Sequence, residues 1–335
     1  MTGTIIPDVS VVICAYAMQR WDQLVAAVES LRAQTVLPRE VVVVVDHNPE
    51  LFERVRNGLP DVIALENREQ RGLSGARNSG IAVAKGAHIA FLDDDAVAMP
   101  DWLSWLTGYD DDDRVLGVGG AADPIWASGR PRWLPEEFYW TIGCSYRGLP
   151  EDTGQVRNPF GGCMCLRREI FEAVGGFRTG VGRVETRPVG CEETELCIRA
   201  RQHWPQRIFL YEPRARILHH VPDKRSRWAY FCSRCYAEGT SKAVVSKFVG
   251  MGDGLSAERA YVLSTLPRGV LRGIADAVKR GDWYGLGRAG AIVAGLAFTT
   301  AGYVAGTISE HLSALKNRLR HASGKVNHGP ANTSP

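Results

Sequence analysis

The sequence predicts an α/β fold, with a mostly parallel sheet flanked by helices and a helical extension at the carboxyl end. Short apolar runs alternate with helix-like segments in the first part of the chain. Such runs are typical of strands buried on both faces, and their alternation with helices favours a parallel, doubly wound sheet. Acidic residues follow two of the runs. We expect these acids at the carboxyl edge of the sheet, where ligands bind.

The first elements follow from the spacing of apolar residues. Val9 to Tyr16 is an apolar run suited to a central strand. The next segment predicts a helix with one apolar face, formed by Leu24, Ala27, Val28 and Leu31. Pro38 ends that helix. The valine-rich run Glu40 to Asp46 and the shorter run Asp61 to Asn67 predict two further strands.

The run His88 to Asp95 ends in three consecutive aspartates. It predicts a strand after a helix from about Gly75 to Lys85, with its carboxylates at the same edge as Asp46. Carboxylates this close raise one another's pKa unless a positive charge lies between them. A divalent cation that bridges to a phosphate meets this requirement, whereas the alternative is a solvated acidic turn.

The segment Arg71 to Gly80 lies between these acids in the sequence. Its glycines allow close backbone approach, and the start of the following helix favours anions. A plain connection between strand and helix explains the glycines equally well, but it leaves Arg77 and Asn78 unexplained.

Residues 115–160 are rich in aromatic side chains among prolines and glycines. They favour a satellite core under a long loop, and the alternative is a platform for a sugar or lipid. Asn158 to Phe177 then predicts a strand and a short helix. Gly190 to Arg201 predicts a further helix, whose early carboxylates suit the helix dipole even without a catalytic role. A last strand, Arg207 to Pro213, precedes His219 and His220.

Composition restricts the class of protein. The chain has 335 residues, 45% hydrophobic and 23% charged, as expected for one large globular domain with an accessory region. Its net charge of +3 gives no argument for binding nucleic acid. The amino terminus lacks the pattern of a secretory signal, and the eight cysteines are scattered, so we expect a reduced cytoplasmic setting.

Six motifs together resemble the inverting family 2 glycosyltransferases of GT-A fold, a Rossmann-like architecture. They occur in the family's order between about Val9 and Val221, and they are VSVVICAY, Asp46, GARNSG, LDDD, GGCMCLRREIFEAVGGF and EETELCIRAR. The chain looks most like actinobacterial members that act on lipid-linked or cell-envelope glycans. We therefore expect a catalytic domain over 8–222, a basic helical region over 223–316 and a disordered tail over 317–335.

The resemblance implies a donor site. Ala15 and Tyr16 would flank the nucleotide base, Asp46 would hydrogen-bond to it, and Arg77 and Asn78 would lie close to it.

The resemblance also implies a metal site for Mg²⁺ or Mn²⁺. Asp93 would face the ribose and assist the metal, Asp95 would hold the metal on the diphosphate, and Asp94 would be a secondary donor-binding residue. His219 would lie near the metal or the diphosphate. His220 is a competing candidate for that place, and the sequence does not separate the two.

The family's general base is the aspartate of a Glu-Asp pair, and it takes the proton of the acceptor hydroxyl. The pair in this chain is Glu192-Glu193, so Glu193 is the expected base. Because a glutamate reaches about one methylene further than an aspartate, the sequence leaves open which of the two acts.

The carboxyl-terminal third changes in character. Lys224, Arg227 and Trp228 resemble the QxxRW motif of processive family members, with lysine in place of glutamine, and suggest contact with acceptor or phosphate. A solvated basic helix face or attraction to anionic lipid headgroups are the alternatives. Ala289 to Ile308 has no charged residue and approaches the length of a membrane span. Its many small residues favour a helix packed on the protein or lying in the membrane interface.

These expectations combine into one function. The chain is expected to move a sugar from a nucleotide-diphosphate donor, a UDP-sugar, to a hydroxyl of a glycan or polyprenyl-phosphate-linked acceptor, at the inner face of the cell membrane. A sugar-phosphate nucleotidyltransferase and a non-catalytic sugar-nucleotide or glycan-binding protein are the alternatives. Neither gives the two adjacent glutamates an obvious task.

Overall fold

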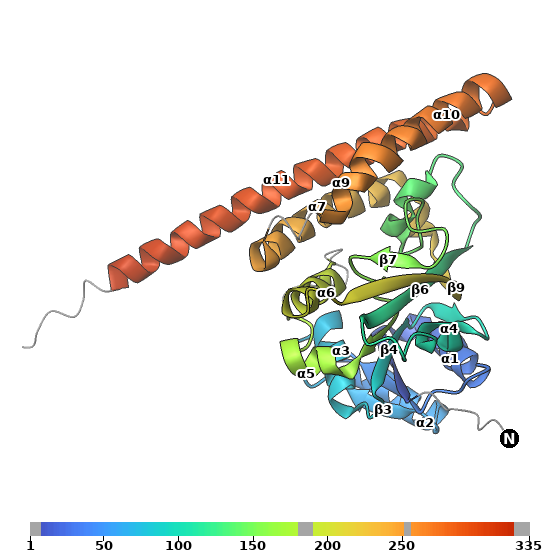
Figure 1. Ribbon diagram of the computed structural model, residues 1–335, viewed down its shortest axis with the longest axis vertical. Coiled ribbons are helices and arrows are strands. Elements are labelled where there is room, and N and C mark those ends of the chain that lie inside the picture. Colours follow the sequence, from blue (N-terminus) through green and yellow to red (C-terminus); the bar gives the residue numbers. More distant parts are fainter. Residues whose placement is uncertain (1–7, 180–189, 251–255, 325–335) are drawn as a thin grey trace, which may run out of the picture.

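The computed structural model describes residues 8–179, 190–250 and 256–324. One mixed, nine-stranded sheet forms the centre of the first part of the chain, and the long carboxyl-terminal helices lie together to one side of this domain (Figure 1). Eight strands follow the order β3-β2-β1-β4-β8-β6-β9-β5, and β7 pairs with β9. The strands are β1 (Val9–Ala15), β2 (Glu40–Val45), β3 (Ile63–Glu66), β4 (His88–Asp93), β5 (Ala96–Ala98), β6 (Val115–Trp126), β7 (Gly154–Val156), β8 (Cys163–Arg167) and β9 (Ile208–Val221).

The strands β3, β2, β1 and β4 are parallel, as the sequence predicted. Val42 to Val45 are fully buried, because helices cover both faces of this half of the sheet. The helices of this domain are α1 (Trp21–Arg32), α2 (Pro49–Gly58), α3 (Leu73–Val83), α4 (Trp102–Thr107), α5 (Arg168–Val174) and α6 (Glu192–His203), with short 3₁₀ turns η1 (Met18–Arg20), η2 (Glu136–Ile142) and η3 (Asp223–Ser226).

The remaining strands depart from a purely parallel sheet. β8 lies antiparallel to both β4 and β6, and β5 and β7 lie antiparallel to β9. The chain passes from β4 to β5 through two residues, Asp94 and Asp95, which is too short for the crossover that a parallel partner needs. The last strand does not end at Pro213 as predicted but runs to Val221, with a register shift opposite Gly120.

The carboxyl-terminal helices are α7 (Trp228–Val249), α9 (Ser256–Ala260), the π-helical turn η4 (Tyr261–Thr265), α10 (Leu266–Arg280) and α11 (Tyr284–Gly324). Aromatic residues of the 115–160 segment, including Phe138 and Tyr139, pack with Phe231 of α7 and Ile292 of α11 in a separate apolar cluster. The predicted satellite core is therefore confirmed. Helix α11 continues into the predicted tail as far as Gly324, and residues 325–335 lie outside the described residues.

Helix α11 packs on α7 with very close backbone contact. A side chain at Gly302 would overlap the carbonyl oxygen of Tyr236, and one at Gly239 would overlap that of Thr299. The segment Tyr284–Ser309 is long and apolar enough to cross a membrane, with a mean hydropathy of 1.6, and 28% of its most apolar window is buried.

Candidate active site

The acidic triplet lies where β4 turns into β5. Asp93 ends β4, and the register between β5 and β9 pairs Ala96 with His219. Ligand atoms of Asp93, Asp95 and His219 all lie within 4.8 Å of one another. Two carboxylates and an imidazole at this separation are a donor set suited to a divalent cation such as Mn²⁺.

The strand geometry separates the two histidines. His219 is buried and its Nε2 lies 3.3 Å from an oxygen of Asp95. Adjacent residues of a strand point to opposite faces, so His220 is directed elsewhere, and its backbone N–H donates to the carbonyl of Asp95. Gly143, at φ +82°, leaves room for the His219 ring, because a side chain there would come within 3.1 Å of it.

Two arginines that the sequence did not single out complete the charge balance. Arg20 of η1 contacts Asp94 at 2.7 Å and Asp95 at 3.2 Å, and Arg225 of η3 lies 3.8 Å from Asp95. His219 and the two arginines hold the pKa of Asp95 below its usual range despite burial. Burial raises the pKa of Asp94 to about 7. The only sequence signal for Arg20 is its position just beyond the carboxyl end of β1.

The candidate base-binding residues lie at the carboxyl ends of β1 and β2. Ala15 is buried, whereas Tyr16 is 42% exposed. The carboxylate of Asp46 accepts hydrogen bonds from the Asn67 side chain at 2.6 Å and from the Gly72 N–H at 2.9 Å. Asn67 was not predicted to take part, although it ends the third predicted strand. A cavity of about 460 Å³ lies alongside and is lined by His47, Pro49, Phe52, Ala64, Leu65, Glu66, Asn67 and Arg68.

Arg77 is buried, and its contacts are with protein groups. It donates to Glu192 at 3.0 Å and to the Gly161 carbonyl at 2.7 Å, and its guanidinium lies against the rings of Phe91 and Phe177. This position makes Arg77 the partner of Glu192. The predicted contact between Arg77 and the nucleotide base remains a prediction.

Asn78 joins α3 to the segment after α5. Its amide donates to the Phe177 carbonyl at 2.9 Å and accepts from the Phe177 N–H at 2.8 Å. Both ends of the amide are thus occupied by the backbone of one residue. Its predicted donor contact also remains a prediction.

Gly161 and Gly162 separate Arg77 from Asp93. A side chain at Gly161 would come within 2.9 Å of the Arg77 guanidinium, and one at Gly162 would overlap the Asp93 carboxylate. The paired glycines of the GGCMC motif therefore allow the partner of Glu192 and a metal ligand to approach the same stretch of backbone.

The two glutamates at the start of α6 differ in their surroundings. Glu192 is buried against Arg77, whereas part of the Glu193 residue reaches solvent although its carboxyl is largely enclosed. Burial of its carboxyl, and then the negative charge of Glu192, raise the pKa of Glu193 to about 7. Cys191 precedes the helix in a left-handed conformation, with φ 73°. A carboxylate with a pKa near neutrality has the properties of a general base.

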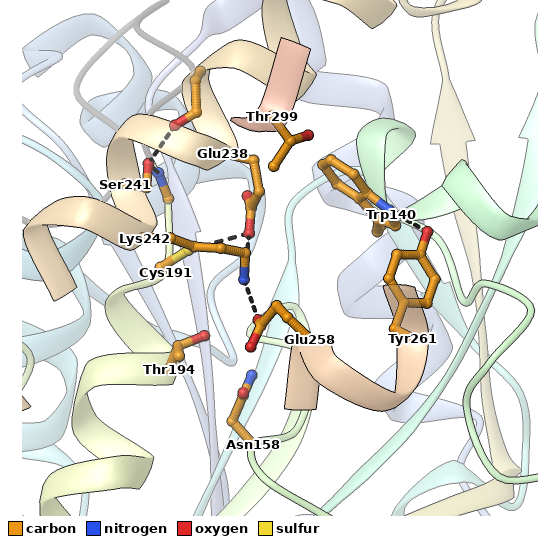
Figure 2. A network of polar contacts seen from close by, with 12 residues as sticks. Trp140, Asn158, Cys191, Thr194, Glu238, Ser241, Lys242, Glu258, Tyr261 and Thr299 are labelled. Carbon is orange, nitrogen blue, oxygen red and sulfur yellow. Dashed lines mark hydrogen bonds and ion pairs between the residues drawn. The ribbon is translucent and has the colours of Figure 1, made fainter. Parts of the chain in front are cut away.

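A buried polar network attaches the carboxyl-terminal helices to the start of α6 (Figure 2). Lys242 lies between Glu238 and Glu258, and Cys191 donates to Glu238 at 3.3 Å. Ser241 accepts from the N–H of Gly190 at 3.2 Å. Helices α7 and α9 thus contribute to the placement of the two glutamates.

Arg227 and Trp228 do not approach the acidic triplet as Arg225 does. Both are exposed at the start of α7, where Trp228 packs against Trp133 and Phe231. The buried Arg225, two positions before Arg227, is the residue that reaches Asp95. The predicted acceptor role of Arg227 and Trp228 stays a prediction.

Comparison with known proteins identifies the family. A family model described as "Glycosyl transferase family 2" matches residues 10–175. The glucosyl-dolichyl phosphate glucuronosyltransferase of Haloferax volcanii is 38% identical over 241 residues, or 71% of this chain and 77% of the relative. The chain belongs to glycosyltransferase family 2. The succinoglycan biosynthesis protein ExoM of Rhizobium meliloti is 26% identical, covering 68% of this chain and 71% of the relative.

A solved structure supports the fold of this glycosyltransferase. Mannosyltransferase PcManGT from Pyrobaculum calidifontis, in complex with GDP-Man and Mn²⁺, has a TM-score of 0.54 at 20% identity, with 88% of each chain covered. The predicted GT-A fold is confirmed, and so is the prediction of a glycosyltransferase over a nucleotidyltransferase or a non-catalytic binding protein.

Proposed function

We propose that this glycosyltransferase is metal-dependent and inverting, and that it moves a sugar from a UDP-sugar to a hydroxyl of a lipid-linked glycan. One observation carries the proposal. Asp93 of the candidate metal site lies against Gly162, and Arg77 lies against the adjacent Gly161 and partners Glu192, the neighbour of the candidate base Glu193.

Asp93, Asp95 and His219 would hold Mg²⁺ or Mn²⁺, because their ligand atoms already lie within 4.8 Å of one another. A bound divalent ion would stabilise the negative charge that develops on the leaving nucleoside diphosphate. Arg20 and Arg225 reach Asp95 from two other elements and add positive charge on the same side of the donor site.

Glu193 would accept the proton of the acceptor hydroxyl. Inversion requires the hydroxyl to attack from the face opposite the leaving group, with a base on the acceptor side. Glu193 is partly exposed and has a pKa raised to about 7, so it is largely ionised at a slightly alkaline pH and still basic enough to take a proton. Glu192, paired with Arg77, would keep its neighbour in place.

The lipid-linked acceptor rests on the Haloferax relative, whose name gives glucosyl-dolichyl phosphate as its acceptor. We extend this to a polyprenyl-phosphate-linked glycan for the present chain. Such an acceptor would place the enzyme at the cytoplasmic face of the cell membrane.

The test is a transfer assay with glucosyl-polyprenyl phosphate and a panel of UDP-sugars, with and without Mn²⁺. We expect transfer from one UDP-sugar only with metal, and a product of inverted anomeric configuration by NMR. Retention of configuration, or equal rates in EDTA, would contradict the proposed mechanism. Transfer from GDP-sugars alone would overturn the choice of donor.

A further inference from the structure

Helices α10 and α11 expose most of the large apolar side chains that reach solvent in the described part of the chain. They include Leu271, Ile274 and Val278 on α10, Trp283 at the turn, and Leu286, Val293, Val304 and Ile308 on α11. We call this set the outer face. A group of exposed apolar side chains of this kind is typical of a surface that binds another protein or a membrane.

The outer face lies on the side of each helix opposite to the side that packs against the rest of the protein. On α10 the buried positions Gly269, Gly273 and Ala277 follow one another at four-residue intervals, about half a turn away from Leu271 and Val278. Figure 1 shows both helices running together on one side of the molecule, with the sheet on their other side.

Helix α11 follows the same rule. Its Gly295 packs against Phe138 and Phe231, and its Gly302 against the backbone of Tyr236. Val293 and Val304 lie on the exposed side and are 59% and 50% exposed. Both helices therefore make their closest contacts through small residues and carry further large apolar side chains on the opposite, exposed side.

Ion pairs attach this helical pair to the sheet domain. Arg272 of α10 contacts Glu137 at 2.8 Å, and Arg132 contacts Asp282 at 3.2 Å. Beneath α11, helix α7 carries the buried charged pair Lys242 and Glu238. If α11 crossed a bilayer while keeping its contacts with α7, these charges would enter the hydrocarbon, at high cost.

We propose that the outer face of α10 and α11 binds a lipid bilayer that contains anionic lipids, with both helix axes in the plane of the membrane interface. The exposed cations Arg268 and Lys279 belong to the same helix as Leu271 and Val278 and suit anionic headgroups. Trp283, 72% exposed at the turn, is a residue typical of membrane interfaces. Binding of this kind does not require that the acceptor be lipid-linked.

The test of the surface is sedimentation of the full chain with vesicles of phosphatidylcholine alone or mixed with phosphatidylglycerol. We expect binding to the mixed vesicles, and a loss of about tenfold or more in the double variant Leu271→Asp/Val278→Asp. The control Leu37→Asp/Ile63→Asp changes exposed apolar residues of the sheet domain and should bind normally. An unchanged thermal shift with UDP and Mn²⁺ in each variant shows that the sheet domain is folded.

The orientation is tested in inverted membrane vesicles with an epitope tag at the carboxyl terminus. Helices in the interface plane leave the tag on the same side as the catalytic domain, so protease removes it and alkaline carbonate releases the protein. A protected tag would establish a membrane span and overturn the proposal. The proposal would also be overturned if the protein did not bind vesicles and formed a dimer that only the Leu271→Asp/Val278→Asp variant loses. The outer face would then be an interface between copies of this chain.

Discussion

Glu192 and Glu193 are adjacent residues of one type with different electrostatic surroundings. Arg77 of α3 partners Glu192. The pKa of Glu193 is raised by burial and by the neighbouring charge of Glu192, and Arg77 opposes this only in part. The first carboxylate is held as an ion pair, and the second has a pKa near 7. A difference in environment, rather than in residue type, assigns the two their separate tasks.

Changing Glu193 to Gln should lower transfer by a factor of about 10² to 10⁴, the usual contribution of a general base. In the unchanged enzyme we expect the rate to rise with pH through about 7, because the carboxyl must lose its proton to act. The measurement is kcat against pH with the donor saturating. A Glu193→Gln variant that keeps the rate and its pH profile would remove this residue from the mechanism.

The same variant should be more stable than the parent at alkaline pH. The native pKa of Glu193 is about 7 and the unfolded value is near 4.5, so the folded state binds more protons and stability falls as pH rises between them. Glutamine does not ionise, so the gain at pH 8 should be on the order of 1–3 kcal/mol. Urea unfolding at pH 5 and pH 8 measures it, and an equal change at both values would contradict the assignment.

The individual residues of the site were predictable in part. Asp46, the acidic triplet and the two glutamates have strong sequence signals, because chemistry restricts the residue type at those places. Arg20 and Asn67 have only their positions after predicted strands as a signal, and Arg225 has none, since the three reach the site from separate turns. The choice between His219 and His220 needed the pairing of β5 with β9, which no local pattern encodes.

At the scale of elements, the short connection between β4 and β5 sets the geometry of the candidate metal site. It reverses the chain within two residues, so β5 pairs with β9 and carries His219 to Asp95. The glycines before β8 then let that strand approach β4. The metal ligands therefore come from β4, β9 and the turn after β4, and their relative position depends on that turn and on a glycine pair.

Gly162→Ala should weaken metal binding without unfolding the protein. The added methyl group would overlap the Asp93 carboxylate and displace it. We expect the thermal shift produced by Mn²⁺ with UDP to fall to a small fraction of its original value. Gly290→Ala is the matched control, because a Cβ there meets nothing within 4 Å and alanine favours a helix. An undiminished shift in Gly162→Ala would show that Asp93 is not needed for the metal.

At the scale of the molecule, the carboxyl-terminal helices form part of the structure of the sheet domain. They complete the aromatic cluster around Phe138, and through Glu238 and Ser241 they contact the residues before α6. The first four strands could be predicted because each has its own apolar pattern. The packing of α7, α10 and α11 could not, because it depends on small residues that meet across long sequence separations.

Gly302→Leu should therefore affect the whole protein. A leucine cannot fit against the Tyr236 carbonyl, so α11 would separate from α7. We expect a loss of several kcal/mol in the free energy of unfolding, within the range for severe overpacking, and greater proteolysis of the carboxyl-terminal helices. Val304→Leu, on the exposed side of the same helix, should be nearly neutral. Equal effects of the two substitutions would contradict the close packing.

Gly161 and Gly162 have a consequence for how this sequence can vary. Neither carries a functional group, yet one lies against the arginine that partners Glu192 and the other against a metal ligand. In a library of all single substitutions selected for activity, we expect these two positions to tolerate as little change as Asp95. At the positions of the catalytic groups, the required chemistry limits which residue types are accepted. At the two glycines, only the space available for a side chain does so.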